Sequence, residues 1–365
     1  MLQPGGFAMA EGRGADTLAS DTMDPEPANA IPRSEEWPPH ELELNDRPTS
    51  RPGGFDRERL RDRLGRLAER GVFLGTSSWK YPGWRGQLYT EDRYVWRGRF
   101  SEARFGRQCL AEYAEVFKTV CVDAAYYKFP DRTYLEGLVS QVPPDFLFAL
   151  KVTDAITIRR FPNLPRFGLH AGKLNEDFLN AERFAEAFLE PCAAFRSNIG
   201  LLMFEFSRFY PSDFGRGRDV VEALDGFLSR LPRGWPYGLE IRNRSFLQPE
   251  YFALLRRHGV AHIYNSWEAM PPVTEQLALP ESRTRPELCA ARFLLKPGRR
   301  YEDAVKRFSP YQRVQEIYPE GRAAGAALIR EAMSRGTPGK TFVYVNNRFE
   351  GNALETIAAM VEQSG

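Results

Sequence analysis

The stretch "IGLLMFEFSRFYPSDFGRGRDVVEALDGFLSRLPRGWPYGLEI", residues 199–241, holds one complete strand–helix–strand unit. Residues 199–206 and 237–241 are near-continuous apolar runs, which is typical of parallel strands covered on both faces. Between them, "GRDVVEALDGFLSRL" has apolar residues at helical spacing and predicts an amphipathic helix. Because parallel strands need a crossover connection, the unit is the βαβ building block of an α/β fold.

Working outward from this unit, the same kind of apolar run occurs six more times, at residues 72–76, 119–123, 146–150, 260–264, 288–295 and 341–345. Helical patterns separate most of these runs. Strand alternating with helix eight times predicts a (β/α)₈ TIM barrel. Two segments depart from the alternation: the proline-rich residues 268–288 predict a loop in place of the sixth helix, and residues 77–100 predict a long aromatic loop.

The first 55 residues differ from the rest in composition. They are rich in glycine, proline, alanine and acids and show little apolar periodicity. Such a segment cannot bury enough apolar surface to offset its ordering entropy, so we predict a disordered tail over residues 1–55. The predicted barrel domain then covers residues 56–365 and opens with an amphipathic helix at 57–70.

The overall composition argues against several classes of protein. The chain has 50 basic and 48 acidic side chains, so there is no strong field to attract nucleic acid, and we expect no nucleic-acid partner. No apolar run reaches the roughly 18 residues of a membrane span, and the N-terminus lacks a secretory pattern, so we expect a cytoplasmic protein. Four widely spaced cysteines predict buried free thiols. The sequence gives no indication of oligomeric state.

Polar side chains occur at the end of every predicted strand. The working sites of TIM barrels are built at the C-terminal ends of the strands, so these side chains are expected to share one rim. Charged groups within apolar strands are costly unless they are paired. Each one alone is explained as well by a structural ion pair as by function, but eight converging ends favour a pocket.

Four ordered blocks stand out along the chain: "GTSSWKYPGWRGQLY", residues 116–158, "LEIRNRSF" and "VYVNNRFEGNA". In order and spacing, over residues 72–363, these blocks resemble the DUF72 (YecE-like) family. The resemblance implies a TIM barrel and a pocket, but no reaction. The chain is a divergent member, because Ile158 and Leu294 replace two family histidines that could transfer protons. Either those histidines are dispensable, or this protein has changed or lost the family's activity.

We expect a small-molecule enzyme that acts on a phosphorylated or polyhydroxylated substrate by acid/base chemistry, without a bound redox cofactor. The candidate catalytic residues are Glu240, Lys151 and Asp123. The candidate substrate-binding residues are Trp79, Tyr81, Tyr127, Glu205, Arg242, Arg292, Asn346 and Asn347. No metal site is predicted, since histidines are scarce at the strand ends.

Two alternatives stay open. Glu240 and Arg242 lie two apart on a strand and so share a face, where pairing would make the acid a poor proton donor. This favours a structural or substrate-orienting role for Arg242. The other alternative is a non-catalytic barrel that binds a ligand or nucleic acid, in which the aromatic loop either grips single strands or packs over the barrel mouth; we favour packing.

Overall fold

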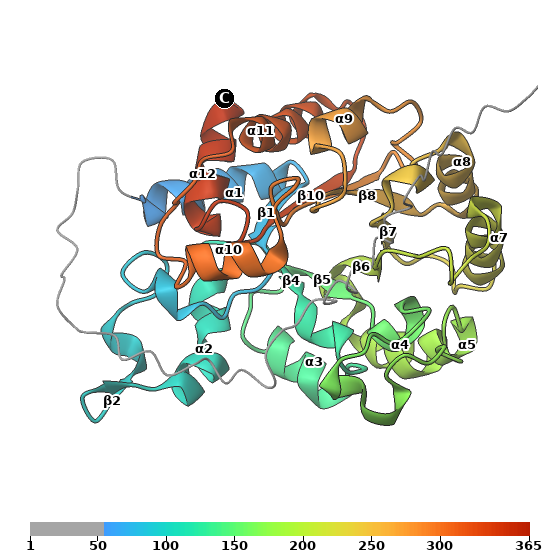
Figure 1. Cartoon of the computed structure of the whole chain (residues 1–365). Coiled ribbons are helices and arrows are strands. Elements are labelled where there is room, and N and C mark those ends of the chain that lie inside the picture. The colour runs from blue at the N-terminus through green and yellow to red at the C-terminus, as the bar shows by residue number, and fades with distance from the viewer. Residues whose placement is uncertain (1–54) are drawn as a thin grey trace, which may run out of the picture.

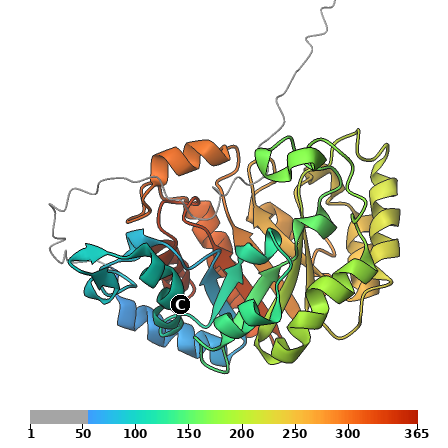
Figure 2. The same ribbon diagram turned by 90° about the horizontal axis from the view of Figure 1, so that it is seen from below.

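The computed structural model describes residues 55–365, and the predicted tail, apart from Phe55, lies outside the described residues. Eight parallel strands form a nearly closed barrel. Helices lie around the strands (Figures 1 and 2). The strands are β1 (Val72–Thr76), β4 (Thr119–Val122), β5 (Leu147–Lys151), β6 (Ile199–Phe206), β7 (Tyr237–Ile241), β8 (Ala261–Ser266), β9 (Leu288–Phe293) and β10 (Lys340–Val345). All eight predicted strands are therefore confirmed, with ends that shift by a residue or two.

The helices occupy the connections between the strands. They are α1 (Arg57–Glu69), α2 (Glu102–Ala114), α3 (Arg132–Val139), α4 (Asp154–Thr157), α5 (Ala181–Phe184), α6 (Glu190–Cys192), α7 (Gly217–Leu228), α8 (Pro249–His258), α9 (Val273–Ala278), α10 (Tyr301–Phe308), α11 (Pro319–Ser334) and α12 (Ala353–Gln363). Local signals set their ends. Asp56 caps α1 by accepting a hydrogen bond from the backbone of Arg59, and α8 stops at Gly259, which is left-handed at φ 63°.

Three connections differ from the predicted pattern. The proline-rich segment is not all loop, because α9 forms directly after Pro271 and Pro272, at the helix start where proline costs no hydrogen bond. The helix expected before β6 is broken into short α, π and 3₁₀ turns around Pro191, whose missing N–H interrupts the ladder. Helix α10 was not predicted at all.

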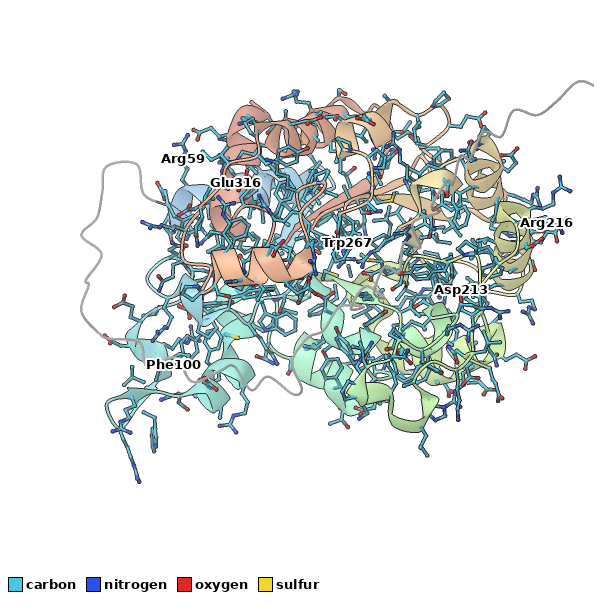
Figure 3. All side chains as sticks on the ribbon, viewed as in Figure 1. Arg59, Phe100, Asp213, Arg216, Trp267 and Glu316 are labelled. Atoms are coloured by element: carbon cyan, nitrogen blue, oxygen red, sulfur yellow. The ribbon has the colours of Figure 1, made fainter. Side chains whose placement is uncertain are left out.

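The aromatic segment 77–100 also has structure of its own. It carries two 3₁₀ turns and a small antiparallel ribbon of β2 (Val95–Trp96) and β3 (Arg99–Phe100). The ribbon projects from the body of the protein at the lower left of Figures 1 and 3, where Phe100 is labelled. Behind the ribbon the segment packs tightly, because Trp84 and Tyr94 are fully buried.

Alternate residues of the strands build two apolar regions. The inward-facing side chains form a separate cluster inside the barrel, made of Phe73, Cys121, Leu147, Ala149, Leu201, Met203, Ala261, Ile263, Leu288, Ala290, Phe342 and Tyr344. The outward-facing side chains join the helices in the larger surrounding core. The four cysteines are all buried and unpaired, which confirms the prediction of free thiols.

The ring of backbone hydrogen bonds has one open seam, between β1 and β4. The two backbones still approach closely, because a Cβ at Gly75 would collide with the carbonyl oxygen of Thr119. The phenol of Tyr113, on α2, spans the gap: its oxygen lies 3.1 Å from the amide of Thr76 and 3.1 Å from the Thr119 carbonyl oxygen. One side chain thus replaces the missing ladder at this point.

The longest described helix, α11, has 16 residues, and no helix within residues 55–365 combines the length and the apolar character of a membrane span.

Candidate functional site

A polar layer lies directly above the apolar cluster inside the barrel. Side chains alternate along a strand, so the residue two positions after an inward-facing one faces inward again. Ala149 is followed in this way by Lys151, Met203 by Glu205, Ile263 by Asn265, and Ala290 by Arg292. Neighbouring strands place these positions level with each other, since Glu205 is in register with Glu240 and Asn265 with Arg292.

Five side chains on or just after four strands, β5, β6, β7 and β9, form what we call the ion cluster: Lys151, Glu205, Glu240, Arg242 and Arg292. Each is at most 5% exposed. Glu205 accepts from Lys151 Nζ at 2.8 Å and Arg292 Nη1 at 2.6 Å through Oε2, and from Arg242 Nη2 at 2.9 Å through Oε1. Glu240 accepts from Arg242 Nε at 3.2 Å and Arg292 Nη1 at 2.8 Å. All four carboxylate oxygens therefore face a cation.

The cations of the cluster determine the charge state of Glu205. Burial alone would raise the pKa of Glu205, but the charges of Arg242, Lys151 and Arg292 outweigh burial and hold that pKa well below its usual range. Burial alone would likewise lower the pKa of Arg292, whereas Glu240 and the other anions around it raise that pKa well above its usual value. Pairing within the cluster therefore favours the charged forms of Glu205 and Arg292.

Two aromatic rings support the cations from the side. Lys151 Nζ lies 3.8 Å from the ring centre of Tyr126, and Arg242 Cζ lies 3.8 Å from that of Trp267, which is labelled near the centre of Figure 3. Both rings are buried. A cation over a desolvated ring gains electrostatic stabilisation and loses freedom to rotate, so the two rings help to fix the orientation of Lys151 and Arg242.

A cavity of about 480 Å³ opens beside Arg242 at the C-terminal end of β7. It is lined by Arg208, Arg242, Asn243, Arg244, Ser245, Gln248 and Ala269. Asn243 joins the loops after β6 and β7, because its side chain exchanges hydrogen bonds of 2.8 and 2.9 Å with the backbone of Phe209. Three arginines and no acid line the cavity, which makes it suited to an anion.

Several buried polar atoms near the strand ends have no hydrogen-bond partner within the described part of the chain. They are Ser77 Oγ, Trp79 Nε1, Asn265 Oδ1, Arg292 Nε and Asn347 Nδ2. Buried polar groups are usually satisfied, and an unsatisfied group in a native protein calls for an explanation such as a water or a ligand. Four of the five atoms are able to donate hydrogen bonds, as an anion would require.

The other predicted residues lie around this rim in different roles. Asp123 is half-buried, with Oδ1 3.6 Å from Arg292 Nη2. The Asn346 side chain accepts from the backbone of Arg348 at 2.9 Å, and that of Asn347 accepts from Ala353 at 2.8 Å. Asn347 therefore holds the start of α12 through its oxygen and leaves only its amide nitrogen for a ligand.

The predicted aromatic residues pack against other side chains of the protein. Trp79 is buried, and the Tyr81 ring packs 4.8 Å from Trp84 and 5.7 Å from Tyr311. Burial raises the pKa of Tyr81, so this phenol stays protonated near neutral pH. Tyr127 has Arg166 over its ring at 4.9 Å. The aromatic loop is thus largely packed against the barrel.

Sequence reasoning missed Asp154, which begins α4 just beyond β5. It is buried and lies 3.0 Å from Arg166 Nη1. Burial raises the pKa of Asp154, although Arg166 and Lys151 oppose the shift. Its place three residues after Lys151 was an available signal, because residues just past a barrel strand also reach the rim. Sequence reasoning also missed the cavity residues Arg208 and Arg244, which likewise lie just beyond the ends of β6 and β7.

Comparison with known proteins agrees with this architecture. The family described as "Protein of unknown function DUF72" matches residues 73–365. A DUF72 protein of Enterococcus faecalis superposes with a TM-score of 0.55 at 20% identity, covering 80% of this chain and 95% of the other. A DUF72 protein of Thermotoga maritima does so with a TM-score of 0.50 at 19% identity, covering 80% and 97%. No curated protein matches. The chain, with its nearly closed barrel and its four ordered sequence blocks, belongs to the DUF72 family.

Proposed function

We propose that the C-terminal rim binds a small hydroxylated molecule carrying a phosphate or carboxylate group, and that acid/base chemistry takes place there. The observation that carries this proposal is the position of Arg242. Its Nε and one terminal nitrogen are held by Glu240 and Glu205, its face is stacked on Trp267, and the same side chain lines the arginine-rich cavity. Within residues 55–365 no hydrogen bond uses its other terminal nitrogen, Nη1.

A guanidinium held in this way is preorganised for an anion. The cost of ordering a long side chain is met by the fold before the ligand arrives, so more of the contact energy is available for binding. Arg208 and Arg244 are exposed and add charge at the cavity mouth. Phosphate and carboxylate are the groups that the planar arginine fork contacts best.

The roles of the acids follow from their partners. Every carboxylate oxygen of Glu205 and Glu240 contacts a cation of the cluster. We therefore assign the two acids to positioning Arg242 and Arg292 rather than to proton transfer. Lys151 supplies charge in the same way. Asp123 lies 3.6 Å from Arg292 Nη2 and is partly exposed, so it is our choice for the group that moves a proton.

Calorimetric titration tests the binding half of the proposal. Sugar phosphates and small hydroxycarboxylates are compared with the matching neutral sugars, and a single-stranded oligonucleotide serves as a further arm. Arg244→Gln and Arg208→Gln should each weaken binding about tenfold to a hundredfold, the loss expected for one charge-assisted contact. The control Arg233→Gln removes an exposed arginine at the opposite end of the barrel, before β7, and should change nothing. Equal affinity in all variants would place the ligand elsewhere.

Proton NMR in D₂O tests the chemistry. An enzyme of this kind should exchange a carbon-bound proton of its ligand for deuterium or convert the ligand, and Asp123→Asn should stop the reaction while leaving the calorimetric affinity within a few-fold.

A barrel that binds without reacting is the second candidate, and the saturation of both glutamates by cations favours it. Binding without exchange or conversion of any ligand would select this second candidate. Tight binding of the oligonucleotide alone would reject both small-molecule versions.

A further inference from the structure

A second cavity lies on the other side of the barrel wall. Its volume is about 230 Å³, and it lies between the outer face of β8 and β9, the loop before β9 and the end of α11. His262, Arg285 and Arg335 line it, together with the ion pair of Arg283 and Glu331. His262 is the second residue of β8 and Leu288 is the first residue of β9. The cavity therefore lies near the N-terminal ends of these strands, away from the C-terminal rim.

His262 gives the cavity a buried polar end. The side chain is 2% exposed, its Nδ1 lies 3.2 Å from the hydroxyl of Tyr251, and its Nε2 has no partner within the described residues. Burial, and then the charge of Arg283, lower the pKa of His262 to about 3, so the ring is neutral near pH 7. A neutral imidazole carries one donor and one acceptor nitrogen, and one of them is left to a ligand.

The arginines at this cavity differ in how fully they are engaged. Arg283 is fully used, since its nitrogens contact Glu331 and the hydroxyl of Tyr264 at 2.8 Å. Arg285 donates from Nε to Glu287 and from Nη1 to a backbone carbonyl, while the described residues supply no acceptor for its Nη2. Among residues 55–365, Arg335 donates one long hydrogen bond, 3.3 Å from Nη2 to Thr341 Oγ1. Arg285 and Arg335 therefore have N–H groups to spare.

The local charge balance favours an anion. Arg283 and Glu331 cancel, and Glu287, outside the lining, pairs with Arg285, so Arg335 is the cation that no acid among the described residues offsets. The C-terminal end of α11 adds a partial negative charge of about half a unit, which is smaller than the charge of Arg335.

We propose that this cavity is a second binding site, for the phosphate or carboxylate group of a small metabolite, in which Arg285 and Arg335 hold the anion and His262 Nε2 makes a hydrogen bond at the buried end. The site is separate from the proposed function of the C-terminal rim and does not depend on it. Its size suits a compact ligand rather than a nucleotide, because typical ligand pockets start at about 300 Å³.

Imidazole ¹⁵N–¹H NMR of the full chain provides the test, since the protein has only four histidines and His262→Gln identifies the signal. Inorganic phosphate, acetate and chloride are titrated at matched ionic strength. We expect a saturable shift of the His262 signals with phosphate or with acetate, and the stronger of the two identifies the anion. Chloride should produce no saturable shift.

Matched variants then localise the effect. Arg285→Gln and Arg335→Gln should each weaken the saturable shift about tenfold or more, while Arg285→Lys should keep part of the affinity. Arg233→Gln and the rim variant Arg244→Gln should leave it unchanged, which separates this site from the first. Thermal unfolding confirms that each variant is folded. A shift that is absent, that chloride reproduces, or that survives both glutamine substitutions overturns the proposal.

Discussion

The barrel interior holds two layers of very different character, built by the same strands one step apart. The lower layer is the apolar cluster around Met203 and Ala290, and the upper layer is the ion cluster around Glu205 and Arg292. Both are almost completely buried. The lower layer stabilises the fold because its apolar side chains are removed from water. The upper layer loses the hydration free energy of five charged groups, and the attraction between the paired charges offsets that loss.

The difference between the two layers suggests that the charges of the upper layer serve a purpose other than stability. Replacing a buried ion network with well-packed apolar side chains is often neutral or stabilising, so stability alone gives little reason to keep charges there. Under the proposed function, cations held at the ends of the strands beside an arginine-lined cavity would do what an apolar layer cannot do, because they would present charge to a ligand without moving.

The largest effect is expected when one carboxylate is removed from the ion cluster. Glu205→Met leaves Lys151, Arg242 and Arg292 without their shared carboxylate, and we expect the free energy of unfolding to fall by about 3–5 kcal/mol. Urea unfolding measures it. The matched control is Met203→Leu, two residues earlier on the same strand, where a volume-conserving change should cost less than about 1.5 kcal/mol. Similar losses for the two variants would mean that the layers are not distinct in kind.

Lowering the pH should also destabilise the ion cluster, with a smaller effect on the free energy of unfolding than the loss of the Glu205 carboxylate. The pKa of Glu205 in the folded protein lies below its unfolded value of 4.5, so its contribution to stability is complete above pH 4.5 and is lost as the pH falls below that value. The difference in slope between wild type and Glu205→Gln should approach about 1.4 kcal/mol per pH unit at most. Stability measured by urea unfolding from pH 5 down to pH 3 gives both slopes, and parallel curves would contradict the assignment.

The smallest loss is expected when the whole ion cluster is replaced. The substitutions Lys151→Met, Glu205→Leu, Glu240→Leu, Arg242→Met and Arg292→Met together leave no unpaired charge within the cluster, although half-buried Asp123 loses the nearby cation Arg292. The free energy of unfolding should stay the same or rise by about 1–4 kcal/mol, while anion binding at the rim disappears. Urea unfolding and calorimetry on the same sample measure the two effects. A large loss of stability would show that the ions hold the barrel together and need no ligand to explain them.

The strands could be predicted from sequence because strands covered on both faces are continuously apolar, as in "IGLLMFEF", and that pattern depends on little else. The pairing of Glu240 with Arg242 could also be predicted, since residues two apart on a strand share a face; the structure confirms it at 3.2 Å. The helix before β6 was only partly predictable, because the apolar pattern continues through Pro191 although the backbone ladder does not.

The rest of the site depends on distances through space that no local pattern encodes. Glu205 meets Arg292, 87 residues away, only because β6 and β9 face each other across the barrel. Sequence therefore placed each charge at the rim but not its partners, and the partners change the proposed role of Glu240 from proton transfer to positioning. Asp154, at the start of α4, and the cavity residues Arg208 and Arg244 lie in the connections that follow the strands, whose course the apolar pattern does not describe.

At the seam between β1 and β4, the hydroxyl group of Tyr113 links the two strands, whereas all other neighbouring strands are joined by backbone hydrogen bonds. Separating β1 from β4 breaks the contacts of one hydroxyl group, whereas separating any other pair breaks a row of backbone bonds. Fluctuations that part the wall should therefore begin at this seam, and the amide hydrogens along it should exchange with deuterium before those of the central strands β6 and β7.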